Sequence, residues 1–276
     1  MPTGYHECFH PGNSGNLKFS IKVTALWATN LGISVIQLPM TRIYFLFLTM
    51  LAFTSNATAE NESLAQQLEA YKAKSTAAAS ESKKAAYEEG VRAVVRAGIV
   101  ASAKQVGDQA PDFTLTNASG EEVTLSTMLK DGPVVLTWYR GGWCPYCNLT
   151  LRALQQKLPE FQAAGAQLLA LTPELPDNSL STSEKNGLEF QVLTDLNHKI
   201  AKEYGTLFNL TPEVARLYKE AFNLQQYNGD DAKDNELPLA ATYIIDKDGT
   251  IQWAFLDADY RNRAEPTDIV AALKAL

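Results

Sequence analysis

The hydrophobic pattern from residue 106 onward alternates between short apolar runs and longer amphipathic stretches. The run PVVLTWY at 133–139 is almost continuous in apolar, β-branched and aromatic residues. Such a run is typical of a strand that is buried on both faces of a sheet. The next stretch, 144–164, carries leucines at helical spacing and ends at Gly165, a residue suited to ending a helix. A buried strand followed directly by an amphipathic helix predicts an α/β fold.

The alternation continues toward the C-terminus and ends in a hairpin. The sequence DKDG at 246–249 separates two apolar runs and predicts a tight turn between antiparallel strands. Together the elements predict a mainly parallel central sheet that is flanked by helices and has an antiparallel hairpin at one edge. The further strands are predicted at 113–116, 123–125, 166–171, 190–193, 242–245 and 250–256, and the further helices at 179–187, 197–204, 212–222 and 265–275.

A segment of different composition, 60–105, precedes this alternation and is rich in Ala, Glu, Lys and Ser. Leu64, Leu68 and Tyr71 fall at helical spacing, which predicts one or two amphipathic helices in this segment. The low-complexity stretch 75–82 leaves a partly disordered linker as the alternative.

Residues 40–59 have the layout of a secretory signal peptide. A single Arg42 precedes the short apolar run 43–53, and the small residues Ala57-Thr58-Ala59 supply a cleavage site. The run is shorter than the ~20 residues that span a bilayer, so membrane anchoring through 43–53 is the less favoured interpretation. We therefore expect an exported protein, in a bacterial periplasm, with no stable membrane association after cleavage.

The signal-like segment does not stand at the start of the chain. We interpret 1–39 as an upstream extension ahead of a translation start at Met40, and a genuine extension with its own role is the alternative. The expected organisation is then this extension, the signal peptide 40–59, a helical segment 60–105 and one domain over 106–276.

Charge and cysteine content narrow the classes of function. The formal net charge of −7 and the absence of a basic stripe argue against a nucleic-acid partner. Beside an isolated Cys8, the cysteines are Cys144 and Cys147, which form one C-x-x-C with no second pair and no nearby His. Two thiols alone make a poor metal site, so we expect no metal and no cofactor, and redox chemistry is the better interpretation.

The C-x-x-C pair falls where a predicted buried strand gives way to a helix. Pro145 suits the first helical position, which makes Cys144 the N-cap and Cys147 the third helical residue. Unpaired N–H groups and the helix dipole favour a thiolate at the cap, so we expect Cys144 to be an exposed nucleophile. The non-helical cap also allows a reversible disulfide with Cys147.

The residues around the pair are candidates for substrate binding. Arg140 would add positive charge beside the thiolates, and Gly141 with Gly142 would leave the approach open. Trp143 and Tyr146 would form an apolar rim for docking. A packed Trp143 and a solvated Arg140 are the simpler alternatives.

Three segments carry a resemblance to a known family: RGGWCPYCNLTLRAL at 140–154, VGDQAPDFTL at 106–115 and LAATYIIDKDGTI at 239–251. The chain resembles the peroxiredoxin-like branch of the alkyl hydroperoxide reductase/thiol-specific antioxidant family, in the thioredoxin superfamily. The resemblance implies a thioredoxin-like fold over 106–276, with a central mixed sheet flanked by helices. It also implies reduction of a hydroperoxide substrate by thiols, with electrons from a thioredoxin-type reductant.

The resemblance and the helix-cap argument assign different roles to the two sulfurs. The family motif Pro-x-x-x-Thr-x-x-Cys places the peroxide-attacking cysteine at Cys147 and the Thr at Cys144, whereas the cap argument favours Cys144 as nucleophile. The sulfur that attacks peroxide therefore stays open. The family's active-site Arg would fall near Ala240 and is absent there. The family's C-terminal pattern also includes residues that would line the site without an assigned role: Tyr260, Arg261 and Arg263.

The leading hypothesis is a thiol-dependent peroxidase that cycles between the dithiol and the disulfide of Cys144 and Cys147. The alternatives are a general thiol–disulfide oxidoreductase of exported proteins and a non-catalytic binding module with a structural disulfide. The short loop argues against a structural disulfide, because it restrains little of the unfolded chain. His198, at a predicted helix start, is interpreted as a surface or capping residue.

Overall fold

A computed structural model describes residues 62–230, 233 and 235–276 of the 276-residue chain. These residues lie within one compact unit, Ala59–Leu276. The upstream extension 1–39 and the signal peptide 40–59 lie outside the described residues, so both stay predictions. Within the described part of the chain, no helix is long and apolar enough to cross a membrane.

The centre of the unit is a mixed five-stranded sheet with the strand order β5-β4-β3-β8-β9. Strands β3, β4 and β5 are parallel, and β8 and β9 add an antiparallel edge, as the sequence predicts. All five residues of β3 are buried, which explains its unbroken apolar run. The strands are β3 (Val134–Trp138), β4 (Gln167–Thr172), β5 (Gln191–Thr194), β8 (Thr242–Ile245) and β9 (Ile251–Phe255).

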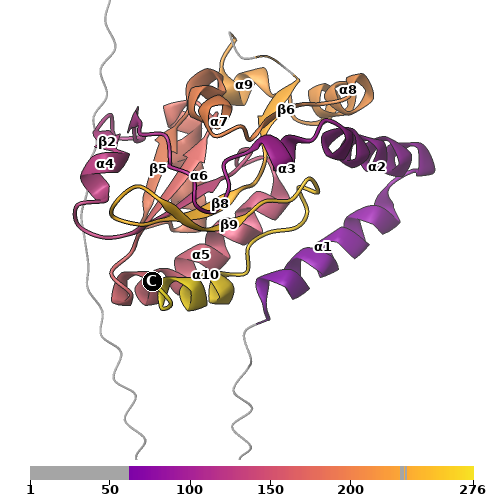
Figure 1. The fold of residues 1–276 in the computed structure, drawn as a ribbon. Coiled ribbons are helices and arrows are strands. Elements are labelled where there is room, and N and C mark those ends of the chain that lie inside the picture. Colours follow the sequence, from indigo (N-terminus) through magenta and orange to yellow (C-terminus); the bar gives the residue numbers. More distant parts are fainter. Residues whose placement is uncertain (1–61, 231–232, 234) are drawn as a thin grey trace, which may run out of the picture. The chain divides into compact units, whose positions relative to one another are not determined.

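Helices and two short pairs of strands surround this sheet (Figure 1). The helices are α4 (Leu125–Met128), α5 (Pro145–Ala163), α6 (Pro176–Asn186), α7 (Lys199–Glu203), α8 (Pro212–Ala221), α9 (Gln225–Asn228) and α10 (Pro266–Leu273), with a 3-10 turn η1 (Leu196–His198). Two antiparallel strand pairs lie outside the main sheet: β1 (Thr114–Thr116) with β2 (Glu122–Thr124), and β6 (Leu207–Asn209) with β7 (Glu236–Pro238). The sequence pattern did not predict β6, β7, α4 or α9, because each has only three or four residues and too little periodicity.

The two faces of the sheet pack into two apolar clusters, because successive side chains of a strand point to opposite faces. On one face, Val135 of β3 and Ile244 of β8 pack with Phe161 of α5 and Ile269 of α10. On the other face, Leu136 of β3 belongs to the larger cluster that also contains both cysteines. Cys144 and Cys147 thus lie within the larger apolar cluster.

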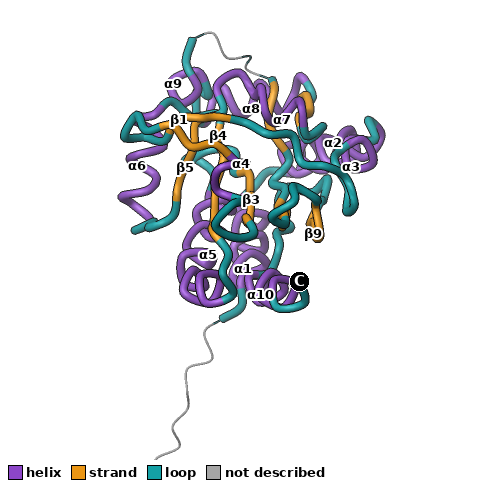
Figure 2. The backbone as a smooth tube through the Cα atoms, turned by 60° about the vertical axis from the view of Figure 1, so that its left-hand side comes forward, coloured by secondary structure: helices purple, strands orange, loops and turns teal. Residues whose placement is uncertain are grey.

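The N-terminal segment forms the helices α1 (Leu64–Ala78), α2 (Glu81–Arg96) and α3 (Ile99–Ser102). Helix α1 packs along α5, as does α10, and α2 contacts α8. Figure 2 shows α1 and α10 lying beside α5 from a second direction. A capping box of Ser63 and Gln66 begins α1, and Ser80 caps α2.

A carboxylate from the far end of the chain also fixes the start of α1. Glu265, the residue before α10, accepts hydrogen bonds from the backbone N–H groups of Leu64 (3.2 Å) and Ala65 (3.0 Å). A carboxylate at a helix N-terminus satisfies free N–H groups and complements the helix dipole. Both ends of the described chain are therefore joined beside α5.

Candidate active site

Cys144 is the N-cap of α5 and follows β3 after a short loop. Its backbone is extended (φ −90°, ψ 112°), Pro145 occupies the first helical turn, and the Cys144 carbonyl accepts the N–H of Asn148 at 3.1 Å. Cys147 is the third residue of the helix. The structure places the pair at the leading turn of the helix, as Pro145 predicts.

The expectation that Cys144 is exposed is wrong. The side chains of Cys144 and Cys147 are both free thiols, and each residue is only 1% exposed. Aromatic rings from distant elements lie over this end of α5: Tyr71 of α1 meets Tyr146 edge-on with ring centroids 5.0 Å apart, and Tyr146 meets Tyr260 at 5.7 Å. The residues next to the pair in the sequence do not indicate that Tyr71 and Tyr260 lie over it.

Arg140 lies beside the pair and is buried, so the alternative of a solvated Arg140 is wrong. Its Nη2 donates to Cys144 Sγ at 3.2 Å, and its Nη1 donates to the Tyr218 hydroxyl at 3.0 Å. The guanidinium carbon also lies 4.0 Å from the ring centroid of Tyr260, which is a close cation–π contact. Hydrogen bonds and ring packing together hold the charge of Arg140 against the Cys144 sulfur.

A second arginine reaches the other sulfur. Arg263, which precedes α10, places Nη2 at 3.7 Å from Cys147 Sγ, and the backbone N–H of Arg140 approaches the same sulfur at 3.5 Å. The family pattern brings Arg263 to attention, but no local feature of the sequence assigns it this contact. Position Ala240, where the family's Arg would fall, is a buried alanine.

The surroundings shift the two thiol pKa values in opposite directions. Burial opposes ionisation of Cys144, but the hydrogen bond from Cys147 and the charges of Arg140 and Arg263 hold the pKa of Cys144 well below its ordinary value. Burial and the neighbouring Cys144 sulfur raise the pKa of Cys147 well above its ordinary value. Ionisation of one sulfur opposes ionisation of the other, so we expect the negative charge on Cys144, beside Arg140.

The glycines before the pair serve close packing and do not leave an open approach. A Cβ on Gly141 would lie 2.2 Å from Trp143 Nε1, and a Cβ on Gly142 would lie 2.1 Å from Thr182 Oγ1. Gly141 also has φ +147°, a backbone conformation that favours glycine. The prediction that these glycines keep the approach open is therefore wrong.

Glu174 supports this loop from β4 and was missed in the sequence. Its side chain is fully buried, accepts the backbone N–H of Gly142 at 2.8 Å, and accepts the hydroxyl of Thr182 at 3.3 Å. Glu174 follows the carboxyl end of β4, and Cys144 follows the carboxyl end of the adjacent parallel strand β3. That placement is a signal that could have identified it, since functional residues gather where parallel strands end.

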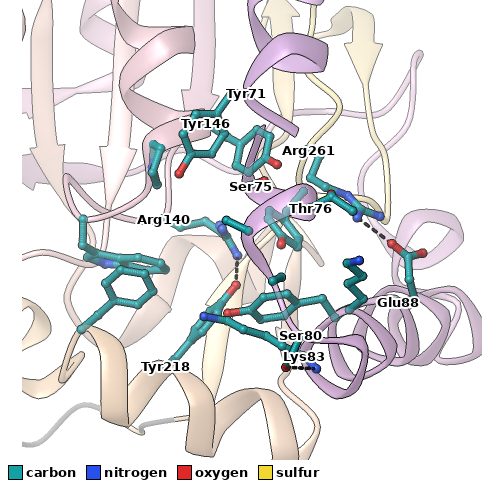
Figure 3. A pocket seen from close by; sticks show the side chains of 18 residues that line it. Tyr71, Ser75, Thr76, Ser80, Lys83, Glu88, Arg140, Tyr146, Tyr218 and Arg261 are labelled. Carbon is teal, nitrogen blue, oxygen red and sulfur yellow. Dashed lines mark hydrogen bonds and ion pairs between the residues drawn. The ribbon is translucent and has the colours of Figure 1, made fainter. Parts of the chain in front are cut away.

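A cavity of about 400 Å³ lies against Arg140 (Figure 3). Trp143 and Tyr146 line it and are both mostly buried, and their part in substrate binding stays a prediction. The packed alternative for Trp143 also holds, because its ring stacks near Phe222 at 4.9 Å. Helices α1 and α2 supply the opposite wall, for example through Tyr71.

The remaining candidates lie elsewhere or have other partners. His198 is at the start of α7, as expected, but it is buried and its side chain does not cap the helix. Arg261 also lines the cavity and is paired with Asp259 and Glu88. Within the described residues, no three His, Cys, Asp or Glu side chains gather as metal ligands.

Comparison with known proteins agrees with this architecture. A model of the AhpC/TSA family matches residues 106–254. The chain is 26% identical over 175 residues to "Peroxiredoxin Q, chloroplastic" of Triticum aestivum, which covers 63% of this chain and 67% of that protein. It is 26% identical over 153 residues to "Peroxiredoxin Bcp" of Escherichia coli K12, which covers 55% of this chain and 86% of that protein.

The crystal structure of peroxidoxin BcpB from Mycobacterium tuberculosis is 20% identical, with a TM-score of 0.49, and the match covers 62% of this chain and 97% of that one. In four further plant proteins named peroxiredoxin Q, the matched region spans only 60–64% of their length. Helices α1 and α2 precede the matched region, and Tyr260 and Arg263 follow it. The family match covers the sheet, the C-x-x-C loop and α5, and the chain belongs to the AhpC/TSA family as a peroxiredoxin-like protein of the thioredoxin superfamily.

Proposed function

We propose that this protein is an oxidoreductase, a thiol-dependent peroxidase that reduces hydroperoxides through Cys144 and Cys147. The observation that carries the proposal is the 3.2 Å contact from the Arg140 guanidinium to Cys144 Sγ in a buried site. Peroxide reduction needs a thiolate, and a buried cation beside the sulfur provides one near neutral pH. Membership of the AhpC/TSA family supports the same chemistry.

In the first step, the Cys144 thiolate attacks one oxygen of the hydroperoxide. An S–O bond forms, the O–O bond breaks, and the remaining oxygen leaves with the electron pair and takes up a proton as the alcohol, or as water when the substrate is hydrogen peroxide. Cys144 becomes a sulfenic acid. Arg140 is placed to stabilise the charge that moves from sulfur to the leaving oxygen.

In the second step, the Cys147 sulfur attacks the sulfenic sulfur of Cys144. The S–S bond forms, the S–O bond breaks, and the hydroxyl leaves as water with the proton of the Cys147 thiol. The raised pKa of Cys147 suits this order, because the proton stays available until the sulfenic acid has formed. An external dithiol of the thioredoxin type then reduces the disulfide by thiol–disulfide exchange.

The depressed pKa favours Cys144 over Cys147 as the attacking sulfur, although the family motif points to Cys147. A general oxidoreductase of folded proteins stays the alternative, because burial of both sulfurs hinders a protein disulfide and the external reductant alike. A structural disulfide has no use for the buried positive charge of Arg140 at the sulfur.

Export is part of the proposal and rests on the sequence of residues 40–59 alone. A chain whose one close cysteine pair is redox-active suits an oxidising compartment. N-terminal sequencing of the protein from the periplasmic fraction tests it. A chain that begins at Glu60 supports the proposal, and a chain recovered from the cytoplasm with residues 40–59 attached contradicts it.

Stopped-flow reaction of the reduced protein with hydrogen peroxide tests the mechanism. We expect the wild type to consume one equivalent and form the Cys144–Cys147 disulfide. Cys147→Ser should consume one equivalent and stop at a sulfenic acid that dimedone traps, and Cys144→Ser should not react. If Cys144→Ser reacted and Cys147→Ser did not, Cys147 would be the sulfur that attacks peroxide and Cys144 the one that resolves the sulfenic acid. No peroxide consumption by the reduced wild type would overturn the peroxidase proposal.

A further inference from the structure

The cavity beside Arg140 is larger than hydrogen peroxide requires. Its volume of about 400 Å³ falls within the ~300–1,000 Å³ range of pockets that bind organic ligands. Hydrogen peroxide is close in size to water, which occupies about 30 Å³ in the liquid. The site therefore has room for a substrate with a substantial organic body.

Seven of the 18 residues that line this cavity are aromatic. Tyr71 and Tyr87 come from α1 and α2, and Trp143, Tyr218 and Tyr260 come from the C-x-x-C loop, α8 and the segment before α10. Figure 3 shows Tyr71 and Tyr218 reaching the cavity from separate elements. Rings offer flat apolar faces, so this lining favours a flat, unsaturated or aromatic body over a branched aliphatic one.

The charges around the cavity favour an anionic substrate. Four cationic side chains and one carboxylate, Glu88, line it. Lys84 is paired with Glu81, and Arg261 with Glu88. The other two cations have no carboxylate partner among the residues that the structure describes. These are Arg140, which contacts the Cys144 sulfur, and Lys83.

Lys83 is the cation that is available for a ligand. Its ammonium lies 5.8 Å from the ring centroid of Tyr87, and no carboxylate of the described residues lies within ion-pair distance of it. Lys83 belongs to α2, which precedes the region that the family model matches. The cavity thus presents Arg140, which contacts the Cys144 sulfur, a set of aromatic rings, and Lys83, which has no carboxylate partner in the described part of the chain.

We propose that this cavity binds organic hydroperoxides that have a flat, unsaturated or aromatic body and a carboxylate. The hydroperoxide group lies toward Arg140 and Cys144, the body packs between the rings, and the carboxylate pairs with Lys83. Helices α1 and α2 are then part of the substrate site. The inference rests on the proposed peroxidase function, and its reaction is the same: the O–O bond breaks, and the product is the alcohol that keeps its carboxylate.

The test compares two substrates of nearly equal shape, cumene hydroperoxide with a para-carboxylate and the methyl ester of the same compound. The readout is the ratio of kcat/KM for the acid to kcat/KM for the ester. We expect Lys83→Gln to lower this ratio about tenfold, since a hydrogen bond to a charged group contributes about that factor. Lys83→Arg should restore it. Lys74→Gln, an exposed lysine of α1 outside the cavity, is the matched control and should leave it unchanged.

A binding measurement separates this inference from the peroxidase proposal. The Cys144→Ser/Cys147→Ser double variant is titrated with the alcohol product, 4-(2-hydroxypropan-2-yl)benzoate, and Trp fluorescence is followed. Saturable binding that weakens about tenfold with Lys83→Gln supports the site even if the wild type consumes no peroxide. An unchanged ratio in Lys83→Gln, or no binding of the alcohol, would overturn the inference even if hydrogen peroxide is reduced.

Discussion

The Arg140 guanidinium and the Cys144 sulfur lie 3.2 Å apart, and neither residue is more than 2% exposed. A buried cation is costly unless an anion or several hydrogen bonds compensate for the lost water. Burial disfavours the charged form of Arg140, yet the neighbouring Cys144 sulfur raises the pKa of Arg140 above its ordinary value. We therefore expect an ion pair of guanidinium and thiolate, in which each charge depends on the other.

The first prediction concerns Arg140→Gln, a substitution that removes the cation beside Cys144. The pKa of Cys144 should rise, and the rate of reaction with iodoacetamide at pH 7 should fall about 10- to 100-fold, because a hydrogen bond to a charged group contributes about 1.5–3 kcal/mol. In the wild type the rate should be flat around neutral pH and fall only when the pH drops through the depressed pKa of Cys144. In Arg140→Gln the rate of reaction with iodoacetamide should continue to increase as the pH rises above neutral.

Two further variants check this interpretation. Arg140→Lys keeps a charge but not the two-pronged contact with Cys144 and Tyr218, so its rate should lie between those of wild type and Arg140→Gln. Arg96→Gln changes an exposed arginine of α2 that pairs with Glu89 and should leave the pH profile unchanged. A wild-type profile that rises only near the ordinary pKa of a thiol would contradict the ion pair.

The second prediction concerns the attachment of α1. Glu265→Gln removes the negative charge that caps the N–H groups of Leu64 and Ala65. Such caps contribute about 1 kcal/mol, so local opening of α1 should become about fivefold more frequent. Hydrogen exchange of the first turn of α1 measures this directly. Because Tyr71 of α1 lies over Tyr146, labelling of Cys144 by a bulky maleimide should also accelerate.

Asp268→Asn is the control for this experiment, because Asp268 lies in the first turn of α10 and is exposed. It should leave the exchange of α1 as it is in the wild type. Equal exchange of α1 in Glu265→Gln and wild type would show that the carboxylate does not hold the helix.

The strand, the turn and the helix around the pair were predictable because their signals are local. Five buried residues in sequence define β3, and Pro145 alone fixes the start of α5. The burial of Cys144 was not predictable, because it depends on Tyr71, which belongs to another helix. The contact of Arg263 with Cys147 joins residues that are 116 positions apart. The resemblance to the family points to Arg263, but no local feature of the chain identifies Cys147 as its partner.

The third prediction concerns Glu174, whose carboxylate accepts the N–H of Gly142. Burial raises the pKa of Glu174, so the folded protein holds its proton more tightly than the unfolded chain. The free energy of unfolding contributed by this group therefore falls as the pH rises from about 4.5, the ordinary value, through the raised folded pKa. Relative to Glu174→Gln, the wild type should lose stability as the pH rises from about 4.5 through the raised folded pKa, as measured by urea unfolding.

A truncation at the same position separates charge from hydrogen bonding. Glu174→Ala leaves the Gly142 N–H without its acceptor and should cost about 1–3 kcal/mol at every pH. Glu184→Gln on α6 is the exposed control and should have little effect on the free energy of unfolding. If the difference between wild type and Glu174→Gln did not change with pH, the carboxyl would not be titrating in a buried site.

The fourth prediction uses His198, which is 1% exposed and lies in the left-handed region with φ 57°. Burial lowers the pKa of His198 from 6.5 to about 4, although a backbone contact with Glu236 favours the charged ring. Among the described residues, neither ring nitrogen has a partner with normal hydrogen-bond geometry. Below pH 6.5 the unfolded chain binds a proton that the folded protein excludes. The contribution to stability is therefore complete above pH 6.5 and is lost as the pH falls toward 4, up to about 3 kcal/mol.

His198→Asn isolates this contribution, because Asn tolerates the left-handed conformation and does not titrate. Between pH 6.5 and pH 4, the wild type should lose about 2–3 kcal/mol of unfolding free energy that the variant does not lose. Urea unfolding of both proteins at matched pH values gives the difference. Parallel curves for the two proteins would mean that His198 is protonated in the fold. Its charge would then have to be met by Glu236, the carboxylate that favours the charged ring.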